Sequence, residues 1–324
     1  MNIYDIAREA GVSISTVSKY LNNKNIRPEL KERVEAVVKK YNFKPNALGR
    51  GLAIKSMKTI AVMVVDIRDP YYAQAAFEID RSLSPQGYRV IMCNTLGSVE
   101  NSVTYLDSLL DISVDGIVFI GSIFNVLNDH ADVLTKLQNI PVVCFNGKLN
   151  VPRCSEIYVD DKLGIYEITK YVASKTNKDI CYIQYLKTHS ATLKKDGYLE
   201  AMEELNREPI IYYTDNLYDG LTPTKKILED DINLGGIISG EDLISLSASN
   251  YLISKGYKVG KDIFITGYNA SVLTDFSPVH LTSVDNRQVE VSNECAKALI
   301  KMMKDKTYKV KMSFKPGISY KESA

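Results

Sequence analysis

The residues whose chemistry is easiest to interpret lie near the N-terminus, on the outer face of a helix that the spacing predicts over residues 14–21. They combine one apolar side chain, several hydroxyls and one ammonium group. Such groups can contact a thymine methyl, the polar edges of bases and a phosphate. The pattern therefore indicates a helix that reads double-stranded DNA, with candidate contacts at Ile14, Ser15, Thr16, Ser18 and Lys19.

Three short helices must position that outer face. Residues 4–10 have helical spacing and are followed by Gly11, where a turn requires a positive φ angle. Ser13 can cap the helix over residues 14–21, and Pro28 suits the first turn of a third helix. Two short helices joined by a glycine turn are typical of a helix-turn-helix, whose second helix enters the major groove. The residues expected to fill its core are Val17, Leu21, Val34, Val37, Val38 and Tyr41.

Charge is divided unevenly along the 324 residues of the chain. Residues 1–58 hold twelve Lys and Arg against five Asp and Glu, whereas residues 59–324 hold 28 against 34. A basic module attached to a mildly acidic one favours contact of the N-terminal part with a polyanion, although a solvated basic surface would carry the same charge. The chain is too long for one compact core, so two or three domains are expected.

From residue 59 onward, β-rich runs alternate with amphipathic helical patterns, which predicts parallel sheets built from βαβ units. Because eight strands exceed one small sheet, we expect two similar lobes. The predicted strands cover residues 60–65, 89–93, 116–120, 142–145, 180–184, 210–213, 236–239 and 264–266. The predicted helices cover residues 72–86, 98–110, 162–175, 192–206, 243–255 and 288–303.

Polar side chains stand at or just beyond several of these strand ends, namely Asp69, Ser122, Asn146 and Asp160. Ligands of open α/β sheets bind at the carboxyl ends of the strands, and two lobes would bring those ends to a shared cleft. Carboxylate, amide and hydroxyl groups hydrogen-bond the hydroxyls of a polyol. The sequence therefore predicts a small-molecule cleft between the lobes.

Motifs for other chemistries are missing from the sequence. The five cysteines show no C-x-x-C spacing and the three histidines no H-x-x-x-H pair, so a metal site has no local support. Neither a glycine-rich phosphate loop nor a G-x-S-x-G elbow occurs. We expect a binding protein without a cofactor rather than an enzyme. The longest apolar run is about eight residues and no signal peptide is recognisable, so neither export nor membrane insertion is expected.

The stretch from Asp5 to Asn22, DIAREAGVSISTVSKYLN, and the segment YNFKPNAL that follows the third helix resemble the LacI/GalR family of bacterial transcription regulators. Segments at residues 66–73, 114–117, 159–164, 265–268 and 281–284 resemble later parts of that family. The resemblance implies an all-α helix-turn-helix DNA-binding domain (residues 1–45), a hinge (46–58) and an α/β two-lobed periplasmic-binding-protein-like effector domain (59–324). Lobe 1 would span about 59–157 and 287–312, and lobe 2 about 158–285.

In that family the hinge folds as a short helix on operator DNA, and a leucine enters the minor groove, a role that the resemblance gives to Leu52. Gly49 and Gly51 stand where the family usually has alanine and serine, and each weakens a helix by up to about 1 kcal/mol. A merely flexible basic linker is the alternative. The expected DNA contacts of the hinge are Asn46, Arg50, Leu52 and Lys55.

The resemblance also assigns residues to the effector cleft. It implies that Tyr71 and Tyr72 place aromatic rings against a sugar ring or a base. The other effector contacts that it implies are Lys194, Glu241, Asp242, Asn269 and Asn286.

Four of these positions depart from the family pattern. Lys194 replaces an arginine and cannot form its bidentate fork. Glu241 replaces an asparagine, Asn269 an aspartate, and Asn286 stands where glutamine is common. These departures leave a sugar, a sugar phosphate and a nucleobase open as the effector, with a sugar expected from the family as a whole.

We therefore expect a cytoplasmic, homodimeric transcription regulator, a repressor rather than an activator, whose operator affinity depends on a small ligand. Two-fold symmetry of the dimer predicts a roughly palindromic operator. Alternatives are a regulator that needs a co-repressor such as a nucleobase or sugar phosphate, a solute-binding protein, and an α/β enzyme. The sequence does not decide between induction and co-repression, or between a dimer and a tetramer.

Overall fold

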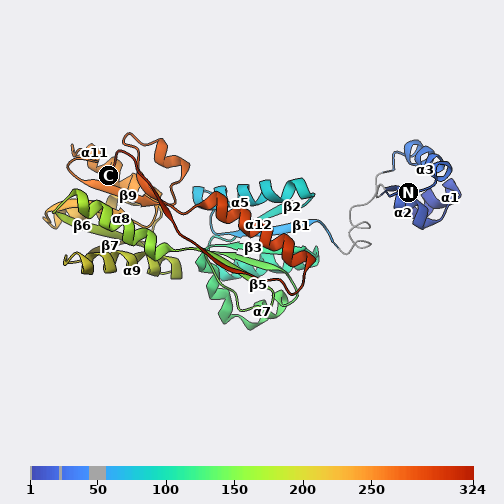
Figure 1. Ribbon diagram of the computed structural model, residues 1–324, viewed down its shortest axis with the longest axis horizontal. Coiled ribbons are helices and arrows are strands. Elements are labelled where there is room, and N and C mark those ends of the chain that lie inside the picture. Colours follow the sequence, from blue (N-terminus) through green and yellow to red (C-terminus); the bar gives the residue numbers. More distant parts are fainter. Residues whose placement is uncertain (1, 22–23, 44–55) are drawn as a thin grey trace. The chain divides into compact units, whose positions relative to one another are not determined.

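The computed structural model describes residues 2–21, 24–43 and 56–324 (Figure 1). Contacts between residues divide the chain into two compact units, Met1–Lys58 and Thr59–Ala324. Among the described residues, no helix combines the length and the apolar character needed to cross a membrane.

The N-terminal unit contains three helices, α1 (Ile3–Ala10), α2 (Ile14–Leu21) and α3 (Pro28–Lys40). Gly11 ends α1 in the left-handed conformation (φ 61°), and the Ser13 hydroxyl accepts a hydrogen bond from Thr16 N at 3.1 Å. The predicted helix-turn-helix is therefore confirmed. The buried residues that hold the helices together are Ile6, Ala7, Ala10, Val17, Val34 and Val37, with Leu21 and Val38 packed against them.

Tyr41 corrects the predicted core of this unit. It follows the last turn of α3 and is 42% exposed. Its hydroxyl donates to Glu9 Oε1 at 2.7 Å, and Lys40 Nζ donates to the same oxygen. A tyrosine at the end of a helix can keep its hydroxyl in a polar contact at the surface, so Tyr41 joins α3 to α1 from outside the core.

The first sheet of the larger unit has six strands in the order β11-β5-β4-β3-β1-β2, and all the neighbouring strands are parallel. Its strands are β1 (Thr59–Val64), β2 (Arg89–Asn94), β3 (Gly116–Ile120), β4 (Val142–Phe145), β5 (Cys154–Val159) and β11 (Lys311–Phe314). Its helices are α5 (Pro70–Leu83) with the short η1 (Ser84–Gln86), α6 (Val99–Asp111), η2 (Ser122–Asp129), α7 (Ala131–Leu137) and α12 (Gln288–Lys304).

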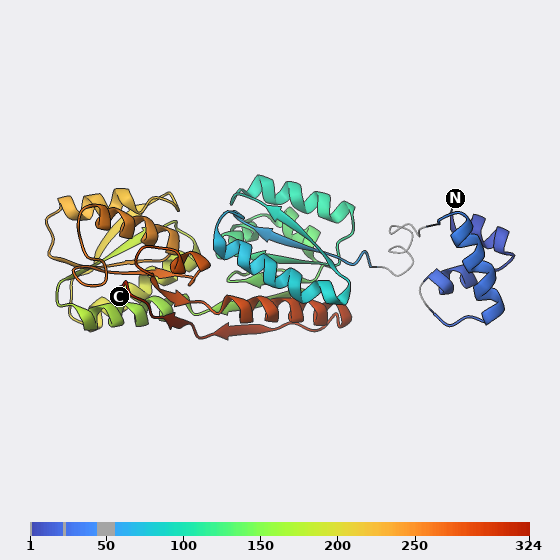
Figure 2. The same ribbon diagram turned by 90° about the horizontal axis from the view of Figure 1, so that it is seen from above.

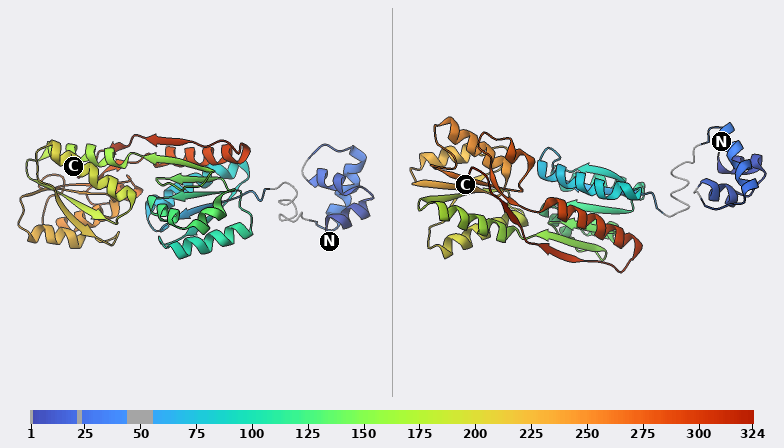
Figure 3. Two further views of the ribbon diagram at one scale, coloured as in Figure 1. Left: turned by 90° about the horizontal axis from the view of Figure 1, so that it is seen from below. Right: turned by 45° about the horizontal axis from the view of Figure 1, so that its top comes forward.

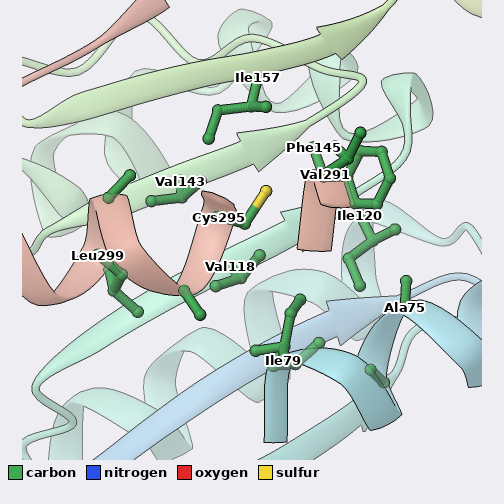
Figure 4. Packing of buried hydrophobic residues seen from close by; sticks show 14 of the residues in the cluster. Ala75, Ile79, Val118, Ile120, Val143, Phe145, Ile157, Val291, Cys295 and Leu299 are labelled. Carbon is green, nitrogen blue, oxygen red and sulfur yellow. The ribbon is translucent and has the colours of Figure 1, made fainter. Parts of the chain in front are cut away.

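Helices α5 and α12 lie side by side on one face of this sheet (Figure 2). Apolar side chains of both helices, including Ile79 and Leu299, pack onto residues of the central strands such as Val118 and Val143 (Figure 4). Side chains of α6, η2 and α7 cover the opposite face in a second buried cluster. Burial on both faces explains why the central strands are continuous apolar runs.

The second sheet has the order β12-β10-β9-β8-β6-β7, with β12 antiparallel to β10 and the other pairs parallel. Its strands are β6 (Asp179–Tyr185), β7 (Ile210–Thr214), β8 (Leu234–Ser239), β9 (Phe264–Tyr268), β10 (Thr282–Asp285) and β12 (Gly317–Ser319). Its helices are α8 (Asp161–Lys175), α9 (His189–Glu204), α10 (Leu221–Glu229), α11 (Asp242–Ser254) and the short η3 (Val272–Asp275).

The chain passes between the two sheets after β5, between β10 and α12, and between β11 and β12 (Figures 2 and 3). All eight predicted strands are present with ends within two residues, and the six predicted helices within three when η1 is counted. The predicted α/β class with two parallel-rich sheets is therefore confirmed. Strands β5, β10, β11 and β12 and helices η2, α7, α10 and η3 are absent from the predicted set.

Candidate functional site

The outer face of α2 presents the predicted DNA contacts in two different ways. Ile14 is 43% exposed, and Ser15 and Lys19 are exposed as well, which leaves an apolar group, a hydroxyl and an ammonium in solvent. Thr16 and Ser18 are half-buried, and the Thr16 hydroxyl is hydrogen-bonded to Ser13 Oγ at 2.9 Å.

The turn before α2 is braced by α3, because Arg33 Nη2 donates to Gly11 O at 3.0 Å. The turn and helix therefore form one unit whose exposed face fits the contacts that major-groove readers make. The predicted hinge contacts Asn46, Arg50, Leu52 and Lys55 lie outside the described residues.

A cavity of about 410 Å³ lies in the larger unit where strands of both sheets end. Its lining comes from the segments that follow β1, β2, β3, β4 and β5 of the first sheet, and from those at the ends of β6, β7, β8 and β9 of the second. This is the edge at which open α/β sheets bind small molecules, and the volume is within the usual range of such sites.

The cavity brings together eight of the eleven predicted effector contacts, five from connections of the first sheet and three from the second sheet's part of the chain. These are Asp69, Tyr71, Tyr72, Ser122, Asn146, Lys194, Glu241 and Asn269. Asp160, Asp242 and Asn286 do not line it.

Asp160 is replaced in the cavity by its neighbour. The Asp160 carboxylate caps α8, accepting from Leu163 N at 3.0 Å. Asp161, buried at 3% exposure, lines the cavity instead and accepts hydrogen bonds from Ser190 Oγ at 2.5 Å and Tyr268 OH at 2.6 Å. The residue that caps a helix and the one after it point in different directions, which a prediction from strand ends does not resolve.

Asp242 and Asn286 do not line the cavity but hold neighbouring residues in position through hydrogen bonds. Asp242 accepts from Ser283 Oγ at 2.6 Å and Ser271 N at 2.7 Å, and its burial raises the pKa of its carboxyl to about 6. It therefore ties the loop after β9 to β10. Asn286 Nδ2 donates to Asn269 Oδ1 at 2.9 Å and so fixes the orientation of an amide that does line the cavity.

The four positions that depart from the family pattern form one connected network. Lys194 Nζ donates to Gly240 O at 2.8 Å and to Glu241 Oε1 at 3.1 Å. Glu241 Oε2 accepts from Asn269 Nδ2 at 3.0 Å, and Asn269 in turn accepts from Asn286. Each of these four side chains is hydrogen-bonded to at least one of the other three, so the departures compensate one another. We call this network of Lys194, Glu241, Asn269 and Asn286 the cavity floor.

Lys194 also lies 4.0 Å from the centroid of the Tyr268 ring and is only 6% exposed. An ammonium over an aromatic face gains electrostatic attraction, more so when it is removed from water. The lysine is thus held in place by a carbonyl, a carboxylate and a ring.

Asp69 reaches the cavity from the first sheet's part of the chain as the N-cap of α5, where Oδ1 accepts from Tyr71 N at 2.9 Å. Its side chain is 8% exposed. Burial, and then the charge of Glu241, raise the pKa of its carboxyl to about 7, because both favour the neutral form.

The tyrosines after Asp69 form the aromatic part of the cavity. The rings of Tyr71 and Tyr72 meet edge to face with centroids 5.0 Å apart, and Tyr71 also packs against Phe145. Burial raises the pKa of both phenols well above the ordinary value, so both are neutral donors at physiological pH.

Several residues of the cavity are missing from the predicted set. Tyr185 directly follows a predicted strand and Asp215 lies two residues beyond another, so the strand-end argument contained the signal for them. Arg68 and Tyr218 lie in loops, where the sequence gives no such signal. The described residues include no group of three or more His, Cys, Asp or Glu side chains placed to hold a metal ion.

The pKa of Asp69 leads to a testable consequence. Since the pKa of this carboxyl in the folded protein exceeds its ordinary value of 3.8, the folded state binds an extra proton between about pH 4 and pH 7. The free energy of unfolding contributed by this group therefore falls as pH rises through that window. We expect Asp69→Asn, which keeps a capping oxygen, to stabilise the ligand-free protein by about 2 kcal/mol at pH 8.

Thermal unfolding at two pH values measures this effect. A gain of 2 kcal/mol corresponds to roughly 5 °C in a unit of this size. At pH 4 the carboxyl is protonated in the folded state and close to half protonated in the unfolded state, so little of the cost of ionising it remains and most of the gain should vanish. The matched control Asp132→Asn, on the exposed face of α7, should shift neither curve. An equal gain at both pH values would contradict the assigned cause.

A helix-turn-helix unit joined to two α/β lobes with a cavity at their strand ends defines a DNA-binding regulator with a small-molecule site. The family described as "Bacterial regulatory proteins, lacI family" matches residues 2–46, and a "Periplasmic binding protein-like domain" matches residues 171–324. An "HTH-type transcriptional regulator" of Lachnoclostridium phytofermentans is 32% identical over 293 residues, which cover 88% of each chain. The chain belongs to the LacI family of bacterial transcription regulators.

Solved structures show the same fold. The lac repressor dimer bound to operator and the anti-inducer ONPF aligns over 100% of this chain and 98% of its own, with a TM-score of 0.87 and 20% identity. The transcriptional regulator CelR in complex with cellobiose aligns over 100% of both chains, with a TM-score of 0.72 and 22% identity.

Proposed function

We propose that this regulator is a homodimeric repressor whose affinity for operator DNA is set by a sugar bound in the cavity. The observation that carries the effector assignment is the lining itself. Phenol rings supply apolar faces, while carboxylates and amides at the strand ends supply acceptors and donors for hydroxyls. The CelR structure was solved with cellobiose, which supports a sugar in a cavity of this fold.

The residues assigned to the effector are those that line the cavity, together with Asp161 in place of Asp160. Asp242 and Asn286 act as positioning residues through the loop after β9 and through Asn269. A ligand that contacts both lobes stabilises one relative orientation of them, and by linkage the DNA affinity changes if that orientation differs between the DNA-bound and free states.

We assign DNA reading to the outer face of α2 and to the hinge contacts. The proposed domain limits are residues 1–45 for the helix-turn-helix, 46–58 for the hinge and 59–324 for the effector unit. The protein acts where the chromosome is, in the cytoplasm, and we assign it no enzymatic activity.

Two measurements on the full-length protein test this function. A thermal-shift screen of neutral sugars and sugar phosphates should give a concentration-dependent rise in Tm for at least one sugar. That sugar should then change the affinity for a duplex selected by the protein from random sequence, weakening it for an inducer and strengthening it for a co-repressor. If sugars shift Tm and leave DNA affinity unchanged, the proposed coupling is wrong.

The contact assigned to Lys19 predicts a distinctive salt response. Because its exposed ammonium is expected to pair with a phosphate, Lys19→Ala should weaken binding about equally on selected and random duplexes. The slope of log K against log salt should flatten by about 1. Lys24→Ala, an exposed lysine beyond the end of α2, is the matched control. A loss confined to the selected duplex would mean that Lys19 reads a base instead.

A further inference from the structure

The cavity lining contains more carboxylates than cations. Two cations among the described residues line it, Arg68 and Lys194. The carboxylates in the same lining are Asp66, Asp69, Asp161, Asp215 and Glu241. A wall of this composition repels an anionic ligand and attracts a cationic one.

Both cations are already paired with cavity carboxylates. Arg68 Nη2 lies 2.6 Å from Asp66 Oδ2, and this ion pair lowers the pKa of the Asp66 carboxyl. Lys194 Nζ lies 3.1 Å from Glu241 Oε1 and is further held by Gly240 O. Within the described part of the lining, neither cation forms an ion pair with any of the other three carboxylates.

Of those three, Asp69 is the carboxylate with an unused acceptor inside the cavity. Asp161 has a hydroxyl donor on each of its oxygens, and Asp215 is exposed to solvent. Asp69 Oδ1 accepts from Tyr71 N, whereas Oδ2 has no hydrogen-bond partner among the described residues. Asp69 is 8% exposed and, in the described part of the chain, only one of its carboxylate oxygens accepts a hydrogen bond, so its ionisation costs free energy. A bound cation would offset that cost.

The aromatic rings next to Asp69 favour the same kind of ligand. Tyr71 and Tyr72 follow it on α5, and Tyr185 and Tyr268 reach the cavity from the second sheet. Ring faces attract ammonium groups, as Lys194 over Tyr268 already illustrates. Rings and a buried carboxylate together are the surroundings that bind a protonated amine.

We propose that the effector is an amino sugar, a polyhydroxylated ring that carries a protonated amine, with the amine held by Asp69. This inference rests on the proposed function, in which the cavity binds a sugar. Hydroxyls of the ring are left for Asn146, Asn269 and Ser122, which offer both donors and acceptors. A phosphate in place of the amine would meet the same carboxylates and be excluded.

Calorimetric titration of the full-length protein at pH 7.5 tests the assignment. The ligands are glucose and cellobiose, their amine forms glucosamine and the glucosamine dimer from chitosan, the N-acetylated forms of both, glucose 6-phosphate, and spermidine. We expect at least one amine form to bind at least tenfold more tightly than its hydroxyl and N-acetyl counterparts, with no binding of glucose 6-phosphate.

Variants separate the role of the charge from the fold. Asp69→Asn keeps the α5 cap and should reduce the preference for the amine over the hydroxyl form to less than threefold. Asp132→Asn, on the exposed face of α7, should keep the full preference. A preference that survives Asp69→Asn would overturn the assignment of the amine to this carboxylate.

The outcomes also distinguish this inference from the proposed function. Equal or tighter binding of the neutral sugars would overturn the amino-sugar assignment and leave the sugar-responsive regulator in place. Binding of spermidine without any sugar would overturn both, as would no binding by any member of the panel.

Discussion

Replacing Val17 by aspartate will abolish sequence-specific DNA binding, with a loss of at least about 100-fold in affinity. Val17 is fully buried among the six residues that form the core of the N-terminal unit. A carboxylate placed there is removed from water without a partner, at a cost of several kcal/mol. A core this small has too little stability to absorb such a cost, so the helix-turn-helix will unfold.

The measurement is a gel shift of full-length protein on a duplex that the wild type selected from random sequence. The control Asn25→Asp adds the same charge at an exposed position between α2 and α3 and should lose less than threefold. Calorimetry of Val17→Asp should keep the unfolding transition of the unit over residues 59–324. Retention of wild-type affinity by Val17→Asp would refute the assignment of DNA reading to this unit.

How much of this fold can be predicted from the sequence depends on how clear the pattern of apolar residues is in each helix and strand. Strands β1, β3 and β4 are buried on both faces and are apolar apart from Thr59, which makes them recognisable from sequence. Strand β10 reads TSVD and strand β12 has three residues, so neither carries an apolar pattern. Both form because the neighbouring strand provides hydrogen-bonding partners, which is information from the tertiary structure.

The candidate site shows the same limit. The topology of parallel sheets brings the polar groups at strand ends to one edge, where they can line a cavity. This argument correctly predicts Asp69, Ser122 and Asn146 as lining residues. Which of two adjacent aspartates faces the cavity depends on which one caps α8, and the sequence does not contain that choice. Nor does it show that the four departures from the family pattern touch one another, because they are up to 92 residues apart in the sequence, from 194 to 286.

Replacing Lys194 by methionine will destabilise the effector unit by about 3 kcal/mol at pH 7 and remove its response to ligand. Methionine retains the volume of the lysine stem, so the loss comes from the ammonium. Without it, the Glu241 carboxylate stays beside Asp69, and Gly240 O loses its donor. A buried charge that loses its partner costs far more than the ion pair itself contributes.

The double variant Lys194→Met with Glu241→Gln tests that reasoning. It removes both charges, while the introduced glutamine can still accept a hydrogen bond from Asn269. We expect it to unfold within about 1 kcal/mol of the wild type, so that the double variant is more stable than Lys194→Met alone and the double-mutant cycle shows a coupling of at least about 2 kcal/mol, larger by whatever Glu241→Gln costs by itself. Denaturant unfolding monitored by circular dichroism measures all four proteins. If the double variant is as unstable as Lys194→Met alone, the cost arises from packing around the lysine stem and the electrostatic account of the cavity floor is wrong. If it is stable and also regains a response to neutral sugars, the ion pair serves to balance charge rather than to bind the ligand directly.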